Sequence, residues 1–203
     1  GAAGLMPQIA PSSLLSLEVY ARERGAFRTR VIAHKKLRTV HVGEHVTLIF
    51  EDELTIRYQV QEMLRIERIF EAEGIRGELE AYNPLIPDGA NWKATMLIEY
   101  PEPEERRRRL AELKGIEDRT WVEVEGFTHV YAIADEDMER ENEEKTSAVH
   151  FVRFDLERKM RAALKGGAGL TVGIDHPNYR ASVRVEPEVR RSLLGDLLAD
   201  DLA

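Results

Sequence analysis

The clearest hydrophobic pattern in the chain runs from Ile56 to Glu71 and has the period of an amphipathic helix. Steps of about 100° per residue place four apolar side chains on one stripe of this helix: Ile56, Val60, Met63 and Phe70. Glu67 falls in the middle of the stripe, and Glu62 lies on its flank beside Ile66, Ile69 and Tyr58. The opposite, solvent-facing side carries Arg57, Gln61, Arg65 and Arg68. The pattern therefore predicts a helix that points two carboxylates into apolar surroundings.

Two helices and a hairpin are expected before this segment. The first helix is capped by Ser12 or Ser13 and ends near Arg24, because Gly25 breaks it. A second amphipathic helix over 26–36 places His34 on one face with Phe27 and Val31. Residues 37–42 and 45–51 alternate as strands around Gly43-Glu44, a pair typical of a type II′ hairpin turn.

The remainder of the chain mixes short strands with short helices. We predict strands over 93–100, 121–125, 129–134, 146–155, 170–175 and 181–185. We predict helices over 103–113 and 156–164, with a leucine-rich amphipathic tail from Pro187 onward. Hairpins with helices inserted between them predict an α+β fold, in which a mostly antiparallel sheet packs with several helices as a single domain over 12–203. Residues 1–11 are expected to be a disordered N-terminus or a remnant of expression, with Met6 as the native start.

Composition narrows the classes of function. The 203 residues carry a net charge of -8, which argues against sequence-independent binding of nucleic acid or anionic membranes. The absence of cysteine excludes disulfides, thiolate catalysis and an iron-sulfur cluster held directly by cysteine. No apolar stretch approaches the roughly 18 residues of a membrane span, and no signal peptide is evident at residues 1–11, so we expect a cytoplasmic protein.

Polar residues on apolar faces form the candidate site: Glu62 and Glu67 on the central helix, His34, His150 in a strand, and Glu99 at a strand end. These are ligand types that suit a divalent metal, iron first and then manganese or zinc. They match neither a Glu-x-x-His nor a His-x-x-x-His pattern, so such a site must be assembled from distant segments.

Two other interpretations of the same residues stay open. The glutamates could be structural ion pairs with Arg30, Arg57, Arg153 or Lys93. They could also act without a metal, with desolvation raising the pKa of Glu62 or Glu67 for general acid or base chemistry beside His34 or His150.

Three further segments have functional interpretations. The loop over 83–93 ends in Asn91-Trp92-Lys93, which could orient a small ligand. The acidic segment Asp135–Glu144 lacks the central glycine of a calcium loop, so we expect a solvated segment that could also dock a basic partner. The leucine-rich tail is expected to cover its own core, with burial in a homodimer as the alternative.

Several sequence blocks resemble an uncharacterised bacterial family, the domain-of-unknown-function family 3501, from about Ser13 to Val185. They are His34-Lys35-Lys36, the segment from Tyr58 to Glu67, Asn83 to Gly89, Asn91 to Met96, Asp135-Glu136-Asp137 and Glu144 to Phe151. The resemblance implies rubrerythrin-like proteins or iron-sulfur oxidoreductases as partners, and a role in iron-linked or peroxide-linked redox metabolism.

The sequence therefore leads to a principal hypothesis and an alternative. The first is a cytoplasmic metal-binding protein, with iron as the expected metal, linked to redox or oxidative-stress metabolism. The alternative is a non-catalytic partner or assembly protein that docks onto an iron-sulfur oxidoreductase through its acidic segment or its leucine-rich tail, in which case the buried glutamates are structural ion pairs.

Overall fold

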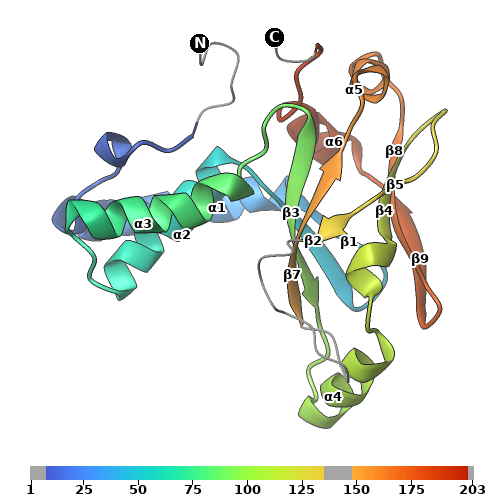
Figure 1. Cartoon of the computed structure of the whole chain (residues 1–203), viewed down its shortest axis with the longest axis horizontal. Coiled ribbons are helices and arrows are strands. Elements are labelled where there is room, and N and C mark those ends of the chain that lie inside the picture. Colours follow the sequence, from blue (N-terminus) through green and yellow to red (C-terminus); the bar gives the residue numbers. More distant parts are fainter. Residues whose placement is uncertain (1–7, 135–147, 201–203) are drawn as a thin grey trace.

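The computed structural model describes residues 8–134 and 148–200, which form two sheets and a group of helices that projects to one side (Figure 1). We call the sheets, with α4 (Pro103–Glu112), α5 (Arg158–Lys165) and α6 (Pro187–Leu194), the β body. We call α1 (Leu17–Lys36), α2 (Glu53–Ile66) and α3 (Ala72–Tyr82), with residues 8–16, the helical arm. Three short 3-10 helices are η1 (Pro11–Ser13), η2 (Asn83–Leu85) and η3 (Ile116–Arg119).

Both sheets of the β body are antiparallel. One has the order β1-β2-β3-β7-β6, with bounds Thr39–His41, Val46–Glu51, Asn91–Ile98, Val149–Asp155 and Ile133–Ala134. The other has the order β5-β4-β8-β9, with bounds Val130–Tyr131, Thr120–Val124, Leu170–His176 and Tyr179–Arg184. Every neighbouring pair of strands runs antiparallel. The predicted α+β class is therefore confirmed.

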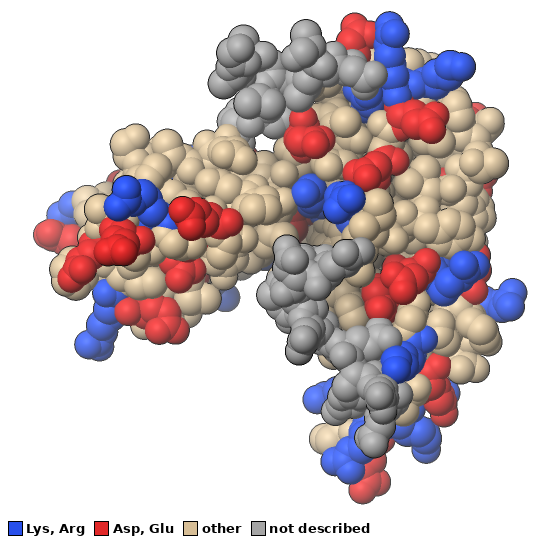
Figure 2. All heavy atoms as spheres, in the orientation of Figure 1, with Lys and Arg blue, Asp and Glu red and all other residues tan. Residues whose placement is uncertain are grey.

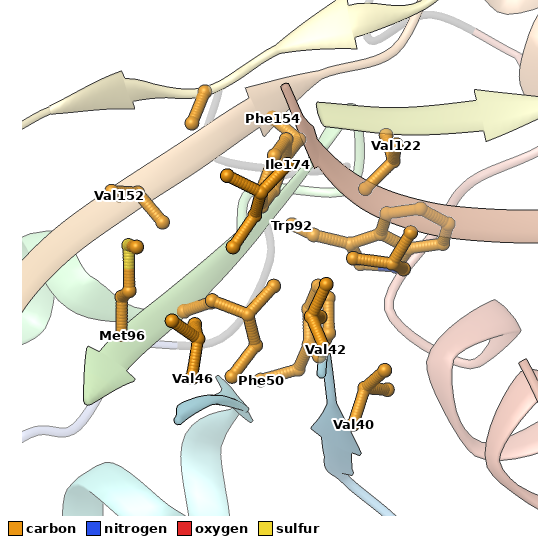
Figure 3. Close-up of a cluster of buried hydrophobic side chains, with 14 of the residues drawn as sticks. Val40, Val42, Val46, Phe50, Trp92, Met96, Val122, Val152, Phe154 and Ile174 are labelled. Carbon is orange, nitrogen blue, oxygen red and sulfur yellow. The ribbon is translucent and has the colours of Figure 1, made fainter. Parts of the chain in front are cut away.

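The main core lies between the two sheets. The five-stranded sheet contributes Phe50, Trp92 and Phe154, and the four-stranded sheet contributes Val122 and Ile174 (Figure 3). These side chains are at most 2% exposed, and burial of each is worth about 1.5–3 kcal/mol. Side chains alternate between the two faces of a strand, which is why Trp92, Ala94, Met96 and Ile98 of β3 all reach this core.

The leucine-rich tail covers this core, as predicted. Leu193 and Leu197 are buried in it, and the indole Nε1 of Trp92 donates a hydrogen bond of 2.9 Å to the carbonyl of Leu193. Arg38, at the junction between α1 and β1, is 1% exposed and contacts the same segment. Its guanidinium donates to both carboxylate oxygens of Asp196, at 3.1 and 2.5 Å.

The helical arm has a second, smaller core. It contains Ile9, Ile56, Val60, Leu64, Leu79 and Ile86. Helix α2 lies between its neighbours and packs against both α1 and α3. Of the 20 residues of α1, two are buried, Tyr20 and Val31, so most of this long helix faces solvent.

Several predicted boundaries differ from the structure. Helix α1 is continuous through Gly25 and is capped by Ser16, so the predicted break and the Ser12 or Ser13 cap are wrong. Residues 129–134 divide between β5 and β6, which belong to different sheets. The first hairpin is confirmed, but Val42 bonds to Val46, so its loop has three residues rather than two.

The N-terminal segment also differs from the expectation where the structure describes it. Residues 1–7 lie outside the described residues. Ile9 is 2% exposed in the arm core, and its backbone N–H donates to Asn83 Oδ1 at 3.0 Å. Residues 8–11 are thus ordered against the arm, because Ile9 buries apolar area there.

Candidate functional site

Glu62 is the predicted site residue with the clearest partners. Its side chain is 17% exposed and lies between α2 and α1. Arg24 donates from Nε and Nη2 to its two carboxylate oxygens, at 2.9 and 2.7 Å, and the Tyr20 hydroxyl donates at 2.8 Å. A bidentate arginine pair is strong and directional. Glu62 therefore forms an ion pair, as one interpretation predicted, although its partner is none of the four cations proposed.

The electrostatics around Glu62 favour its charged form. The hydrogen bonds from Arg24 hold the pKa of Glu62 below its usual range, against the opposing effect of burial. Burial, helped by the Glu62 charge, raises the pKa of Tyr20. Glu62 therefore lacks the raised pKa that a general acid requires.

Glu67 is exposed, and its predicted burial in an apolar stripe is wrong. Helix α2 begins earlier than predicted, at an Asp52-Thr55 capping box, and ends at Ile66 with Glu67 as its C-cap. Arg68 then takes a left-handed conformation with φ of 53°, so the 100° step no longer applies. Phe70 is 72% exposed for the same reason.

His34 lies at the root of the arm, where α1 meets the β body. Its Nε2 is 2.6 Å from Asp52 Oδ2, the same carboxylate group that caps α2. Arg38 Nε lies 3.7 Å from Asp52 Oδ2. Burial raises the pKa of Asp196, the other carboxylate beside Arg38, to about 6 despite the opposing charge of Arg38.

His150 and Glu99 contact other parts of the β body. His150, on β7, is 4% exposed, and its Nε2 lies 3.7 Å from the buried Glu117 Oε2. Glu99, just after β3, is exposed and accepts a hydrogen bond of 2.5 Å from Thr47 Oγ1. Glu62, His34, His150 and Glu99 thus each have a different partner, and Glu67 is exposed to solvent.

The described part of the chain holds no group of three or more His, Asp or Glu side chains with an arrangement suited to a metal ion. The absence of such a group is established for residues 8–134 and 148–200 alone. The acidic segment Asp135–Glu144, proposed as a docking segment, lies outside the described residues.

The aromatic ring at the end of the loop over 83–93 was predicted to face a ligand site but belongs to the core. Trp92 is fully buried in the body core, and Asn91 Oδ1 accepts the backbone N–H of Asp88 at 3.0 Å. Lys93 does line a cavity of about 350 Å³ on the outer face of the five-stranded sheet, together with Glu51 and Arg153. The indole therefore stabilises the fold, and the lysine faces the cavity.

The helical arm carries a larger groove, of about 560 Å³, between α1, α2 and the segment before α1. Its apolar lining is Leu15, Ala26 and Phe27, and its charged lining is Arg22, Glu23, Arg30 and Arg57. Gln61, at its base, exchanges two hydrogen bonds with the backbone of Leu15, at 2.8 and 3.3 Å. These bonds fix one wall of the groove to α2.

Two residues of this region were not anticipated. Gln61 was predicted to face solvent but is 2% exposed, because residues 8–15 fold back over that side of α2. Arg24, which pairs with Glu62, was not among the cations predicted as its partners. The spacing of Tyr20, Arg24, Phe27 and Val31 is that of one helix face, a signal hidden by the assumption that Gly25 ends the helix.

Comparison with protein families gives a match over nearly the whole chain. The model of the family described as "Protein of unknown function (DUF3501)" matches residues 8–197. The chain belongs to the DUF3501 family. The predicted family resemblance is confirmed, and the match begins at the residue where the described part of the arm begins.

A solved structure resembles this DUF3501 protein closely. It is a crystal structure of a novel protein of unknown function from Burkholderia pseudomallei K96243, with 55% identity and a TM-score of 0.89. The match covers 94% of this chain and 100% of that one, so it includes both the arm and the body. No protein with a curated description matches the chain.

Within residues 8–134 and 148–200, this DUF3501 protein has no helix that is both long and apolar enough to cross a bilayer.

Proposed function

We propose that the protein is a non-catalytic partner protein whose helical arm receives an acidic, apolar segment of another protein. The observation that carries this proposal is the arm groove, in which apolar side chains lie among three arginines. This follows the alternative hypothesis, with Glu62 as a structural ion pair, but puts the docking surface on the arm rather than on the acidic segment or the tail. The buried Leu193 and Leu197 make the tail unsuitable as a docking surface.

The charges of the groove specify the chemistry of the occupant. Arg22, Arg30 and Arg57 give three positive charges, and Glu23 gives one negative charge. Arg57 is already paired with Glu53 at 2.5 Å, whereas Arg22 and Arg30 form no ion pair with any described residue. A carboxylate-bearing segment would be recognised by the two available guanidinium groups.

Exposed apolar side chains are concentrated on the arm, and one of them, Leu15, lines the groove. Among the described residues, seven large hydrophobic side chains are exposed, and five of them lie on or next to the arm helices: Leu15, Ile32, Leu37, Ile66 and Phe70. Figure 2 shows the arm projecting from the body with solvent on several sides. Interfaces typically combine an apolar centre with arginine and a polar rim, which is the composition of this groove.

Site-specific cross-linking tests the proposal. A photoreactive amino acid at Ala26, in the groove, should cross-link one partner through a segment that contains both acidic and apolar residues. With that purified partner, Arg22→Glu together with Arg30→Glu should weaken binding by at least about tenfold, or roughly 1.4 kcal/mol. Rubrerythrin-like and iron-sulfur oxidoreductase proteins, the partners that the family resemblance implies, are the first to test in purified form.

The matched control is Arg107→Glu, because Arg107 is an exposed helical arginine on α4, in the body. It should leave binding unchanged. A cross-linked segment without acidic residues, or unchanged binding by the Arg22 and Arg30 variant, would overturn the proposal. Cross-linking to a second copy alone would replace the partner with a homodimer.

Metal binding and a redox role remain predictions from the sequence. Elemental analysis by plasma mass spectrometry, on tag-free protein purified without chelators, tests them directly. Near-stoichiometric iron, manganese or zinc that disappears in Glu62→Gln would restore the metal hypothesis, since Glu62 would then be a ligand rather than an ion-pair partner.

A further inference from the structure

A second surface feature of the β body is a groove of about 380 Å³ between β9, α6 and the turn that precedes β8. Three arginines line it, Arg184 at the end of β9 and Arg190 and Arg191 on α6. The turn between α5 and β8 contributes Gly167 and Gly169. None of these residues belongs to the arm, so this groove is independent of the proposed docking surface.

Arg190 is held in place by backbone carbonyl groups. Its Nε donates to the carbonyl of Ala168 at 2.9 Å, and its Nη2 donates to the carbonyl of Leu164. The Leu164 carbonyl lies in the last turn of α5, where the helix dipole is negative, and the Ala168 carbonyl lies in the turn that follows. The side chain is thus ordered before any ligand arrives, which reduces the entropy that binding would cost.

Arg184 lies directly against Gly169. A Cβ atom added at Gly169 would be 2.5 Å from Arg184 Nη2 and 2.9 Å from its Cζ. Any other side chain begins with this carbon and would displace the end of the Arg184 side chain from its present position. The glycine therefore lets the guanidinium of Arg184 lie close over the turn.

The groove has an excess of positive charge. The three arginines are opposed by one lining carboxylate, Glu186. Arg184 and Arg191 form no ion pair with any described residue. Guanidinium groups have a planar array of donors that matches the oxygens of a phosphoryl group.

We propose that this groove binds the phosphoryl group of a small phosphorylated molecule. Arg190 supplies an ordered charge, and Arg184 and Arg191 supply donors that no carboxylate among the described residues occupies. A nucleic acid is a poor occupant, because a chain with net charge -8 repels a long polyanion outside the groove itself. A small ligand contacts only the positively charged groove and is not repelled by the negative charge of the rest of the surface.

Isothermal titration calorimetry with inorganic phosphate, pyrophosphate and glucose 6-phosphate tests the site, with sodium acetate at equal ionic strength as the reference anion. We expect at least one phosphoryl compound to bind with one-to-one stoichiometry, and acetate to bind at least about tenfold more weakly. Arg184→Gln and Arg191→Gln should each weaken that binding by about tenfold or more. Gly169→Ala should also weaken it, because the added Cβ displaces Arg184.

Arg107→Gln is the matched control, since it removes an exposed arginine elsewhere on the body, and it should not change the affinity. Thermal melting of each variant verifies that it is folded. No binding of any of the three phosphoryl compounds by folded wild-type protein would overturn the proposal. It would also fail if affinity were the same in the Arg184 and Arg191 variants, or if single-stranded DNA bound in preference to the small compounds.

Discussion

In the β body, two sheets bury their apolar faces against each other, whereas in the helical arm one long helix buries two of its 20 residues. Each region also encloses an arginine-carboxylate pair. In the body, Arg38 is 1% exposed and its partner Asp196 is 8% exposed, but in the arm Arg24 is 33% exposed and Glu62 17%. The same interaction is thus buried in one region and partly hydrated in the other. The comparison shows how one chain combines a rigid core with a helical surface that remains accessible.

Loss of the body pair should have the largest effect. Arg38→Met removes the bonds to Asp196 and to the carbonyls of Phe50 and Glu51. We expect a loss of about 3–5 kcal/mol in the free energy of unfolding, because a buried carboxylate is left without its cation. Urea denaturation measures this loss. The double variant Arg38→Met, Asp196→Asn should lose less than the sum of the two single variants, and strict additivity would contradict the assigned pairing.

Loss of the arm pair should cost less. Glu62→Gln keeps the volume of the side chain but removes the charge that Arg24 and Tyr20 contact. We expect a loss of about 1–3 kcal/mol, as for hydrogen bonds to charged groups, reduced by the hydration of Arg24. Glu67→Gln is the control, because Glu67 is exposed. Equal losses in both variants would mean that the Arg24 contact does not stabilise the arm.

The two carboxylates should respond oppositely to pH. The pKa of Glu62 is lowered by Arg24, so its stabilising contribution is present at neutral pH and disappears as pH falls below about 4.5 and through the folded pKa. Burial raises the pKa of Asp196 to about 6, so its contribution is greatest at low pH and is lost as pH rises through about 6.

Melting temperatures of wild type and variants between pH 4 and 8 check these two opposite pH dependences, because ordinary carboxyl groups titrate near the lower end of this range. The destabilisation by Glu62→Gln should shrink toward pH 4. Relative to Asp196→Asn, wild type should gain stability from pH 7 to pH 5. A difference that does not vary with pH would show that the pKa of that carboxylate is the same in the folded and unfolded states.

The smallest effect on stability is expected at the arm surface. Ile66 and Phe70 are 63% and 72% exposed, so Ile66→Ser and Phe70→Ser should each change the unfolding free energy by about 0.5 kcal/mol or less. The matched body variant is Ile174→Ser, at 2% exposure, which should lose several times more. Comparable losses at all three positions would mean that Ile66 and Phe70 are buried in solution.

The sequence predicted the body better than the arm. The patterns over residues 45–51 and 93–100 identified β2 and β3 with small errors in their ends, and β3 shows the two-residue repeat of burial expected of a strand. The tail was also predicted correctly, since Leu193 of α6 and Leu197 just after this helix are both buried in the main core.

The arm was harder to predict because its burial depends on segments distant in the sequence. Gln61 is covered by residues near Leu15, and nothing in the helix itself indicates that contact. Helix α3 was missed, since Gly74 and Gly77 weaken its local helix signal. The proposed ligand Glu67 followed from periodicity extended past Ile66, where the helix had already ended.

The contact between Arg38 and the tail has a consequence for the order in which the chain folds. Arg38 and its partner Asp196 are separated by 158 positions, and Trp92 and Leu193 by 101. On the ribosome, the strands of the N-terminal half emerge well before α6, at about 5–20 residues per second. During that interval a guanidinium and an indole of the body lack their native partners. The body therefore completes its core after synthesis of α6, whereas the arm helices can associate while translation continues.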